Sequence, residues 1–161
     1  MHRIPVYVKS ITLDPDSNSP VMLLQELNGP RTLPIWIGVM EATAIASELE
    51  RLHFTRPMTH DLLVAFIKKM GIEILEIEIS EIKNDTFYAL ITAQHGDLTT
   101  TIDARPSDAV AIALKTKAPI YVNERVLQRI QLETAINDSS QPQNWNQLLE
   151  ELGPEHFKYK M

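Results

Sequence analysis

Two stretches of the chain, Glu41-Ala-Thr-Ala-Ile-Ala46 and Asp108-Ala-Val-Ala-Ile-Ala113, are nearly the same sequence, 67 residues apart. The alignment extends back from them without a gap and pairs residues 21–46 with residues 88–113, with 8 of 26 positions identical. Alanine-rich helices match easily, so the shared glycine and isoleucine that precede the alanines carry more weight. An internal repeat of this size indicates a duplicated structural unit.

Length and composition indicate a globular protein with a substantial core. The chain has 161 residues, of which 44% are hydrophobic and 22% are charged, so it suits one compact or duplicated domain. No segment has the roughly 18–20 consecutive apolar residues that span a bilayer. The first five residues lack the apolar region of a secretory signal. Because cysteine is also absent, we expect a cytoplasmic protein without membrane association.

The net charge of −6 limits the partners of the chain. Nucleic-acid-binding proteins usually carry a basic face, because neutralising phosphates drives their affinity. Here, four glutamates follow one another along a single predicted strand, at positions 73, 76, 78 and 81. Binding of RNA or DNA would therefore depend on a local basic patch or a bound metal, and we expect it to be weak.

The first unit is predicted to contain three strands and then two helices. The strands fall at residues 5–13, 21–27 and 32–37, and the first helix presents a face of Ala42, Ile45, Leu49 and Leu52. In the second helix, Thr59 is expected as the N-cap and Asp61 lies in the first turn. The buried face of that helix is predicted to consist of Leu62, Leu63, Phe66, Ile67 and Met70.

The second unit repeats this plan. Its strands are expected at residues 72–82, 86–94 and 98–104, followed by a helix at 108–117, a short strand at 118–122 and a last helix to about residue 135. The helix at 108–117 is apolar nearly all round, so it should be deeply buried. Ser107 is expected to cap this helix and Asn123 to cap the last one.

These elements predict an α+β fold made of a duplicated β-β-β-α-α unit. We expect pseudo-two-fold symmetry, a mostly antiparallel or mixed sheet and buried helices. Residues 1–136 would form one domain, with repeats at about 3–71 and 72–136, and residues 137–161 would form a linker and a C-terminal helix. In that tail, Trp145 and Phe157 are expected to cover the domain or a partner subunit, so a homo-oligomer is predicted.

The two copies differ in the residues that could carry chemistry. The second copy has Asp103, Arg105 and Ser107 where the first has tryptophan, glycine and methionine. Residues two apart on a strand point to the same side, so Asp103 and Arg105 either pair with each other inside the fold or face one cleft. Ser107 has no visible base, and N-capping accounts for it.

A second polar cluster contains Arg56, His60 and Asp61, and its order of Arg-Pro, hydroxyl residue and Asp repeats the order around Arg105. If the fold joins the two clusters, the arginines could hold phosphate and the carboxylates could hold a divalent cation. This combination is typical of metal-assisted phosphodiester hydrolysis. Glu41 and Asp108 have an alternative role, which is to stabilise the N-terminus of the helix that each begins.

The same segments resemble the bifunctional nuclease domain family. The matching stretches include Leu33-Pro-Ile-Trp-Ile-Gly38, Arg56-Pro57-x-Thr59-His60-Asp61-Leu62 and Asp103-Ala-Arg-Pro-Ser-Asp-Ala109, and the likeness covers roughly residues 3–136. The tail resembles that of short bacterial members, and nothing in the chain resembles the UVR motif of some relatives. The resemblance implies a nuclease acting on RNA and on single- or double-stranded DNA with little sequence preference.

Three hypotheses follow for the polar residues. In the first, a non-specific nuclease holds Mg²⁺ or Mn²⁺ with its carboxylates, binds phosphate with its arginines, and uses a histidine as general base or acid. The metal ligands would be Asp103, Asp108, Asp61 and Glu41, the catalytic residues His60, Asp103, Arg105 and Asp108, and the phosphate-binding residues Arg56 and Arg105. In the second, the cluster belongs to a non-enzymatic regulatory module that binds an anion or a nucleotide. In the third, it is an internal salt-bridge network.

Overall fold

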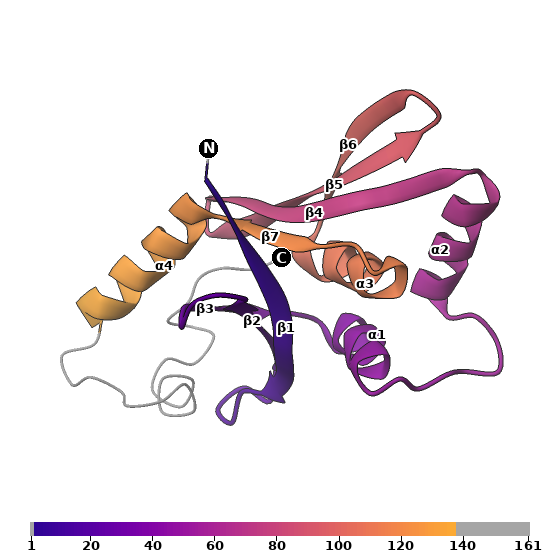
Figure 1. Ribbon diagram of the computed structural model, residues 1–161. Helices are drawn as coiled ribbons and strands as arrows, with labels where there is room; N and C mark the ends of the chain where they lie inside the picture. Colours follow the sequence, from indigo (N-terminus) through magenta and orange to yellow (C-terminus); the bar gives the residue numbers. More distant parts are fainter. Residues whose placement is uncertain (1, 138–161) are drawn as a thin grey trace.

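The computed structural model describes residues 2–137, which form one seven-stranded sheet and four helices (Figure 1). In chain order the elements are β1 (Arg3–Leu13), β2 (Pro20–Glu26), β3 (Thr32–Trp36), α1 (Val39–Leu49), α2 (Thr59–Lys69), β4 (Ile72–Lys83), β5 (Thr86–His95), β6 (Leu98–Ala104), α3 (Pro106–Thr116), β7 (Ile120–Asn123) and α4 (Glu124–Asn137). Each predicted strand is present, and its bounds lie within two residues of the prediction.

The sheet has the order β3-β2-β1-β7-β4-β5-β6. Neighbouring strands are antiparallel except β4 and β7, which are parallel, so the predicted α+β fold with a mixed sheet is confirmed. Three strands lie on each side of β7, and α1 and α3 both have 11 residues and begin 67 residues apart. A duplication would produce this arrangement, but the duplication itself stays a prediction.

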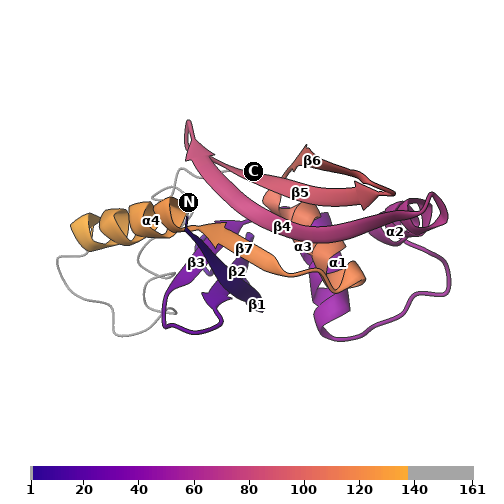
Figure 2. The same ribbon diagram turned by 45° about the horizontal axis from the view of Figure 1, so that its top comes forward.

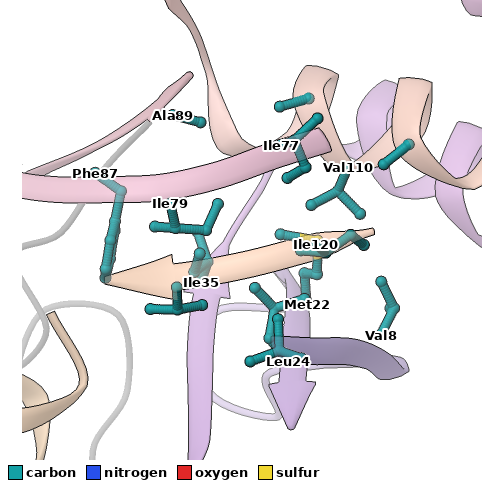
Figure 3. Packing of buried hydrophobic residues seen from close by; sticks show 14 of the residues in the cluster. Val8, Met22, Leu24, Ile35, Ile77, Ile79, Phe87, Ala89, Val110 and Ile120 are labelled. Atoms are coloured by element: carbon teal, nitrogen blue, oxygen red, sulfur yellow. The ribbon is translucent and has the colours of Figure 1, made fainter. Parts of the chain in front are cut away.

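Helices α1 and α3 lie side by side against one side of the sheet, whereas α2 and α4 lie at opposite ends of β4 (Figures 1 and 2). The core forms where β2, β4 and α3 meet, with Met22, Ile77 and Val110 among its buried side chains (Figure 3). The expected burial of α3 is confirmed, because all five residues from Ala109 to Ala113 are buried. Three of these residues are alanines, which allow close approach of α3 to its neighbours.

The predicted buried face of α2 is wrong. Leu62, Leu63, Phe66 and Met70 are exposed, and among the described residues of α2 the buried one is Val64. Ile67 is partly buried against the core. An apolar stripe on a helix predicts that the helix is amphipathic, but it does not say where the core lies. Here α2 lies at one end of the sheet, where it contacts α3 and β4 (Figure 1).

Two of the three expected N-caps are shifted in the structure. The N-cap of α2 is Met58, and its backbone N–H donates to the Asp61 carboxylate at 3.0 Å. The N-cap of α3 is Arg105, because Pro106 already has the helical φ of a first position and Ser107 is buried inside the first turn. Asn123 is confirmed as a cap, since its side-chain oxygen accepts from the Arg125 N–H at 3.0 Å.

The predicted C-terminal helix and tail, which contain Trp145 and Phe157, lie outside the described residues. Within residues 2–137, no helix combines the length and the apolar character that crossing a bilayer requires. The boundary predicted near residue 136 stays a prediction.

A candidate active site between α1, α2 and α3

A cavity of about 860 Å³ opens where α1, α2 and α3 meet. One face of α3 lines it, because Arg105, Asp108, Ile112 and Lys115 follow one another at spacings of three and four residues. The remaining lining comes from α1, the connection between α1 and α2, the start of α2, and strands β5 and β6. Ion pairs occupy both ends of the α3 face.

At the first end, Arg105 lies between two carboxylates. Its Nε donates to Asp108 Oδ2 at 2.9 Å, its Nη2 lies 2.8 Å from the same oxygen, and its Nη1 lies 3.0 Å from Glu41 Oε1. The hydrogen bond to Asp108 raises the pKa of Arg105 above its ordinary value. The equivalent acids of the two sequence copies, Glu41 and Asp108, therefore meet at one guanidinium. Their role extends beyond stabilising the helix that each begins.

Gly38 leaves room for this ion pair. It is the N-cap of α1, and a Cβ at this position would collide with the carboxylate of Glu41. Gly38 also occupies the position in the first copy that Arg105 occupies in the second. The first copy therefore has no side chain at this position, and the space is used by the ion pair between Arg105 and Glu41.

His60 completes the cluster from the first turn of α2. Its Nε2 lies 2.9 Å from Asp108 Oδ1, and the His60 side chain is 16% exposed. An ionised carboxylate accepts hydrogen bonds and does not donate them, so Nε2 carries the proton in this contact. In the neutral imidazole, Nδ1 is then left with a free lone pair. Asp108 thus contacts both Arg105, whose guanidinium is of a kind that binds phosphate, and His60, a candidate general base.

At the second end, Lys115 joins three helices. Its Nζ donates to Glu48 of α1 at 2.7 Å and to Asp61 of α2 at 2.5 Å, and its side chain is 9% exposed. Burial lowers the pKa of Lys115, but the hydrogen bonds to the two carboxylates outweigh burial and leave this pKa raised. The hydrogen bond from Lys115, with a further one from the Met58 N–H, lowers the pKa of Asp61.

The structure does not bring Asp103 and Arg56 into these clusters. Asp103 is exposed, lies opposite Leu90 in the β5–β6 pairing and lines the cavity, but its side chain makes no ion pair or hydrogen bond within residues 2–137. Arg56 is exposed and does not line the cavity, although its neighbours Thr55 and Pro57 do. Of the two arrangements predicted for Asp103 and Arg105, the pairing is absent, because Arg105 caps α3 and turns to Asp108 and Glu41, whereas the shared cleft is present, because both residues line the cavity.

The four carboxylates expected to bind a metal do not form a metal site as they stand. Within the described part of the chain, no group of three histidine or acidic side chains is placed to hold an ion. Three of the four already pair with protein cations, Glu41 and Asp108 with Arg105, and Asp61 with Lys115. The donors therefore do not fit a preformed divalent site, and a metal requirement stays a prediction.

Sequence reasoning missed the Glu48–Lys115 pair. The two residues lie 67 positions apart and so are equivalent in the two copies, yet they carry opposite charges. Opposite charges at equivalent positions of two packed helices were the available signal. Lys115 alone does not indicate an ion pair, because a cation also suits the last turn of α3, where the helix dipole favours it.

We expect Lys115→Met to lower the free energy of unfolding by about 1–2 kcal/mol, because two partly exposed carboxylates lose their cation. The difference from wild type should be constant between pH 3.8 and 10.5, the ordinary pKa values of the two groups. The pKa of Asp61 is lowered, so its contribution is lost as pH falls further. The pKa of Lys115 is raised, so its contribution is lost as pH rises further.

Denaturant unfolding across this pH range measures the effect. The exposed Lys117, which has no ion-pair partner among the described residues, provides the control Lys117→Met. Equal stability of the two variants at neutral pH would show that Lys115 does not hold the three helices together.

Comparison with known proteins matches residues 22–135 to the bifunctional nuclease domain. An uncharacterized protein of Mycobacterium tuberculosis is 39% identical over 163 residues, covering 95% of this chain and 97% of that protein. Bifunctional nuclease 2 of Oryza sativa subsp. japonica is 32% identical over 108 residues, covering 65% of this chain and 33% of the plant protein.

Bifunctional nuclease 2 of Arabidopsis thaliana is 27% identical over 110 residues, which cover 66% of this chain. The chain therefore spans about a third of the length of these plant relatives. The matched residues include both ends of the α3 face and His60, so the similarity covers the cavity and every strand except β1 and the start of β2. The chain belongs to the bifunctional nuclease domain family.

Proposed function

We propose that the chain is a nuclease that hydrolyses phosphodiester bonds of RNA and DNA with little sequence preference. The observation that supports this most is the hydrogen-bonded set of His60, Asp108 and Arg105 in an open cavity. A base, a group that orients it, and a cation for phosphate are the parts that such a reaction needs. The plant relatives named bifunctional nucleases support the same reaction class.

In this mechanism His60 acts as the general base. Asp108 accepts a hydrogen bond from Nε2–H and so fixes the tautomer, which leaves Nδ1 to take a proton from the attacking water. The water oxygen bonds to phosphorus as the bond to the leaving alkoxide breaks. The alkoxide takes up a proton from solvent, and His60 later releases the proton that it gained to solvent. The positive charge that His60 gains lies beside the Asp108 carboxylate, which stabilises it.

Arg105 is the group suited to the phosphate. Its side chain is 51% exposed, and its contacts with Glu41 and Asp108 occupy three of the five N–H donors of a guanidinium. The other two can donate to phosphate oxygens. The two carboxylates hold the guanidinium in place but also repel a phosphate, so we propose weak substrate binding that suits the net charge of −6.

We expect His60→Ala and Asp108→Asn each to lower kcat by about 10²–10⁴-fold while the fold is kept. The first variant removes the base, and the second removes the carboxylate that orients it. Matched controls are His53→Ala, which also changes a histidine of the cavity lining, and Asp103→Asn, which changes an unpaired aspartate. Cleavage of labelled RNA and DNA would be measured with every variant. Wild-type rates in the two site variants would mean that this cluster is not the active site.

The same assay tests the alternative function. In the alternative, the cluster binds a small anion or nucleotide for regulation, and the pairing of every lining cation with carboxylates favours weak, reversible binding. Thermal stabilisation by a nucleotide, with no cleavage of RNA or DNA by the purified protein, would support this function and contradict the nuclease.

Metal dependence is a separate question. The sequence predicts metal assistance, but protein cations already hold Glu41, Asp108 and Asp61, so we propose instead that cleavage continues after chelation with EDTA. Activity that is lost on chelation and restored by Mg²⁺ or Mn²⁺, but not by Zn²⁺, would contradict this. It would show that the site requires a divalent cation.

A homo-oligomer, predicted from the tail, remains part of the proposal. Exposed apolar side chains on the outer side of α2 support it, because large apolar patches often mark contact surfaces. We expect light scattering after size exclusion to give the mass of two or more chains, where one chain has a mass of 18.3 kDa. A mass of one chain at micromolar concentration would rule out a stable assembly.

A further inference from the structure

We propose that the apolar part of this cavity binds an unpaired nucleobase, so that the site accepts single-stranded RNA or DNA and discriminates against duplexes. The inference rests on the proposed function for the phosphate contact at Arg105. It adds a specificity-determining surface, whose centre is Phe54 in the connection between α1 and α2.

Six exposed apolar side chains line the cavity beside its charged groups. The side chains come from α1, the α1–α2 connection, α2 and β6, and they are Met40, Leu52, Phe54, Met58, Leu63 and Ile102. Single exposed apolar residues are ordinary, but six around one hollow indicate a ligand with a flat or apolar part. The volume of about 860 Å³ lies in the range of small-molecule sites.

The charges of the lining select which part of a nucleic acid can enter. Among the described residues, five carboxylates line the cavity, at positions 41, 48, 61, 103 and 108, against the two cations Arg105 and Lys115. Lys115 is 9% exposed and engaged with its acids, whereas Arg105 is 51% exposed. Phosphates therefore meet an accessible cation at Arg105 and are repelled by the remaining lining.

A nucleobase fits the remaining lining by its chemistry. It is uncharged, it presents a flat face that stacks on an aromatic ring such as Phe54, and its amino groups donate hydrogen bonds that carboxylates accept. A base in a duplex is stacked and paired, so it would have to leave the helix before it could enter. A base in a single strand is already free, which gives the preference for unpaired substrates.

The chain offers matched pairs of residues for the test. Phe54 is 49% exposed and lines the cavity, and Phe66 is 66% exposed on α2 and does not line it. Leu63 and Leu62 form a second pair on α2, with Leu63 in the lining and Leu62 outside it. Because all four side chains are exposed, replacement by alanine should leave folding intact, which circular dichroism and light scattering would verify.

The experiment compares three labelled probes of the same sequence: a single strand, a hairpin duplex, and a single strand in which one nucleotide lacks its base. Kd is measured by fluorescence anisotropy and cleavage is measured separately. We expect Phe54→Ala and Leu63→Ala to weaken binding of the single strand by about tenfold and several-fold, with Phe66→Ala and Leu62→Ala within twofold of wild type. The hairpin should bind more weakly than the single strand and respond little to Phe54→Ala.

Equal affinity for single strand and hairpin, or unchanged binding by Phe54→Ala, would overturn the base site even if both probes are cleaved normally. Conversely, a preference for single strands that depends on Phe54, without any cleavage, would support the base site and remove the nuclease function. The two proposals thus fail on different readouts.

Discussion

The contact on which this site depends is the hydrogen-bonded pairing of one lysine with two carboxylates from different helices. Lys115 of α3 binds Glu48 of α1 and Asp61 of α2, in a position where little water reaches its ammonium group. Helix α2 buries little of its apolar surface, so packing alone fixes it weakly. Since His60 precedes Asp61 by one residue, the same ion pair also sets where the imidazole lies.

At the other end of α3, a cation again lies between two carboxylates, and here the cluster is suited to catalysis. Arg105 is held by Glu41 and Asp108, and Asp108 also accepts the His60 hydrogen bond. Groups that are held in place before the substrate arrives need little reorganisation during the reaction, which favours catalysis. The carboxylates that provide this order also weaken attraction of a polyanion. An acidic protein with one accessible arginine at the cavity is therefore suited to act on substrates that it binds loosely.

Sequence periodicity predicted strands such as β5, where burial alternates along nearly the whole strand. Strands β2 and β3 are buried along nearly their whole length, and the turn residues that join them indicated these strands instead. Periodicity failed for α2, where the apolar stripe of Leu62, Phe66 and Met70 is exposed. It also placed Thr59 and Ser107 one or two residues away from the true caps, because a hydroxyl residue near a helix start satisfies the pattern whether or not it occupies the cap. In α3, Pro106 fixes the first turn and makes Arg105 the cap.

The sequence by itself determined the elements, the burial of α3, and the set of polar residues from which a site could form. Those features depend on local periodicity and on residue types, which a chain carries wherever it folds. Only the tertiary structure decided that Glu41 and Asp108 share Arg105 and that His60 joins them. It also decided that Asp103 lines the cavity without pairing and that Arg56 lies outside the cavity. The contact of His60 with Asp108 joins residues 48 positions apart, and that of Glu48 with Lys115 joins residues 67 positions apart. The other contacts depend on which way a side chain turns, and no local sequence pattern specifies either property.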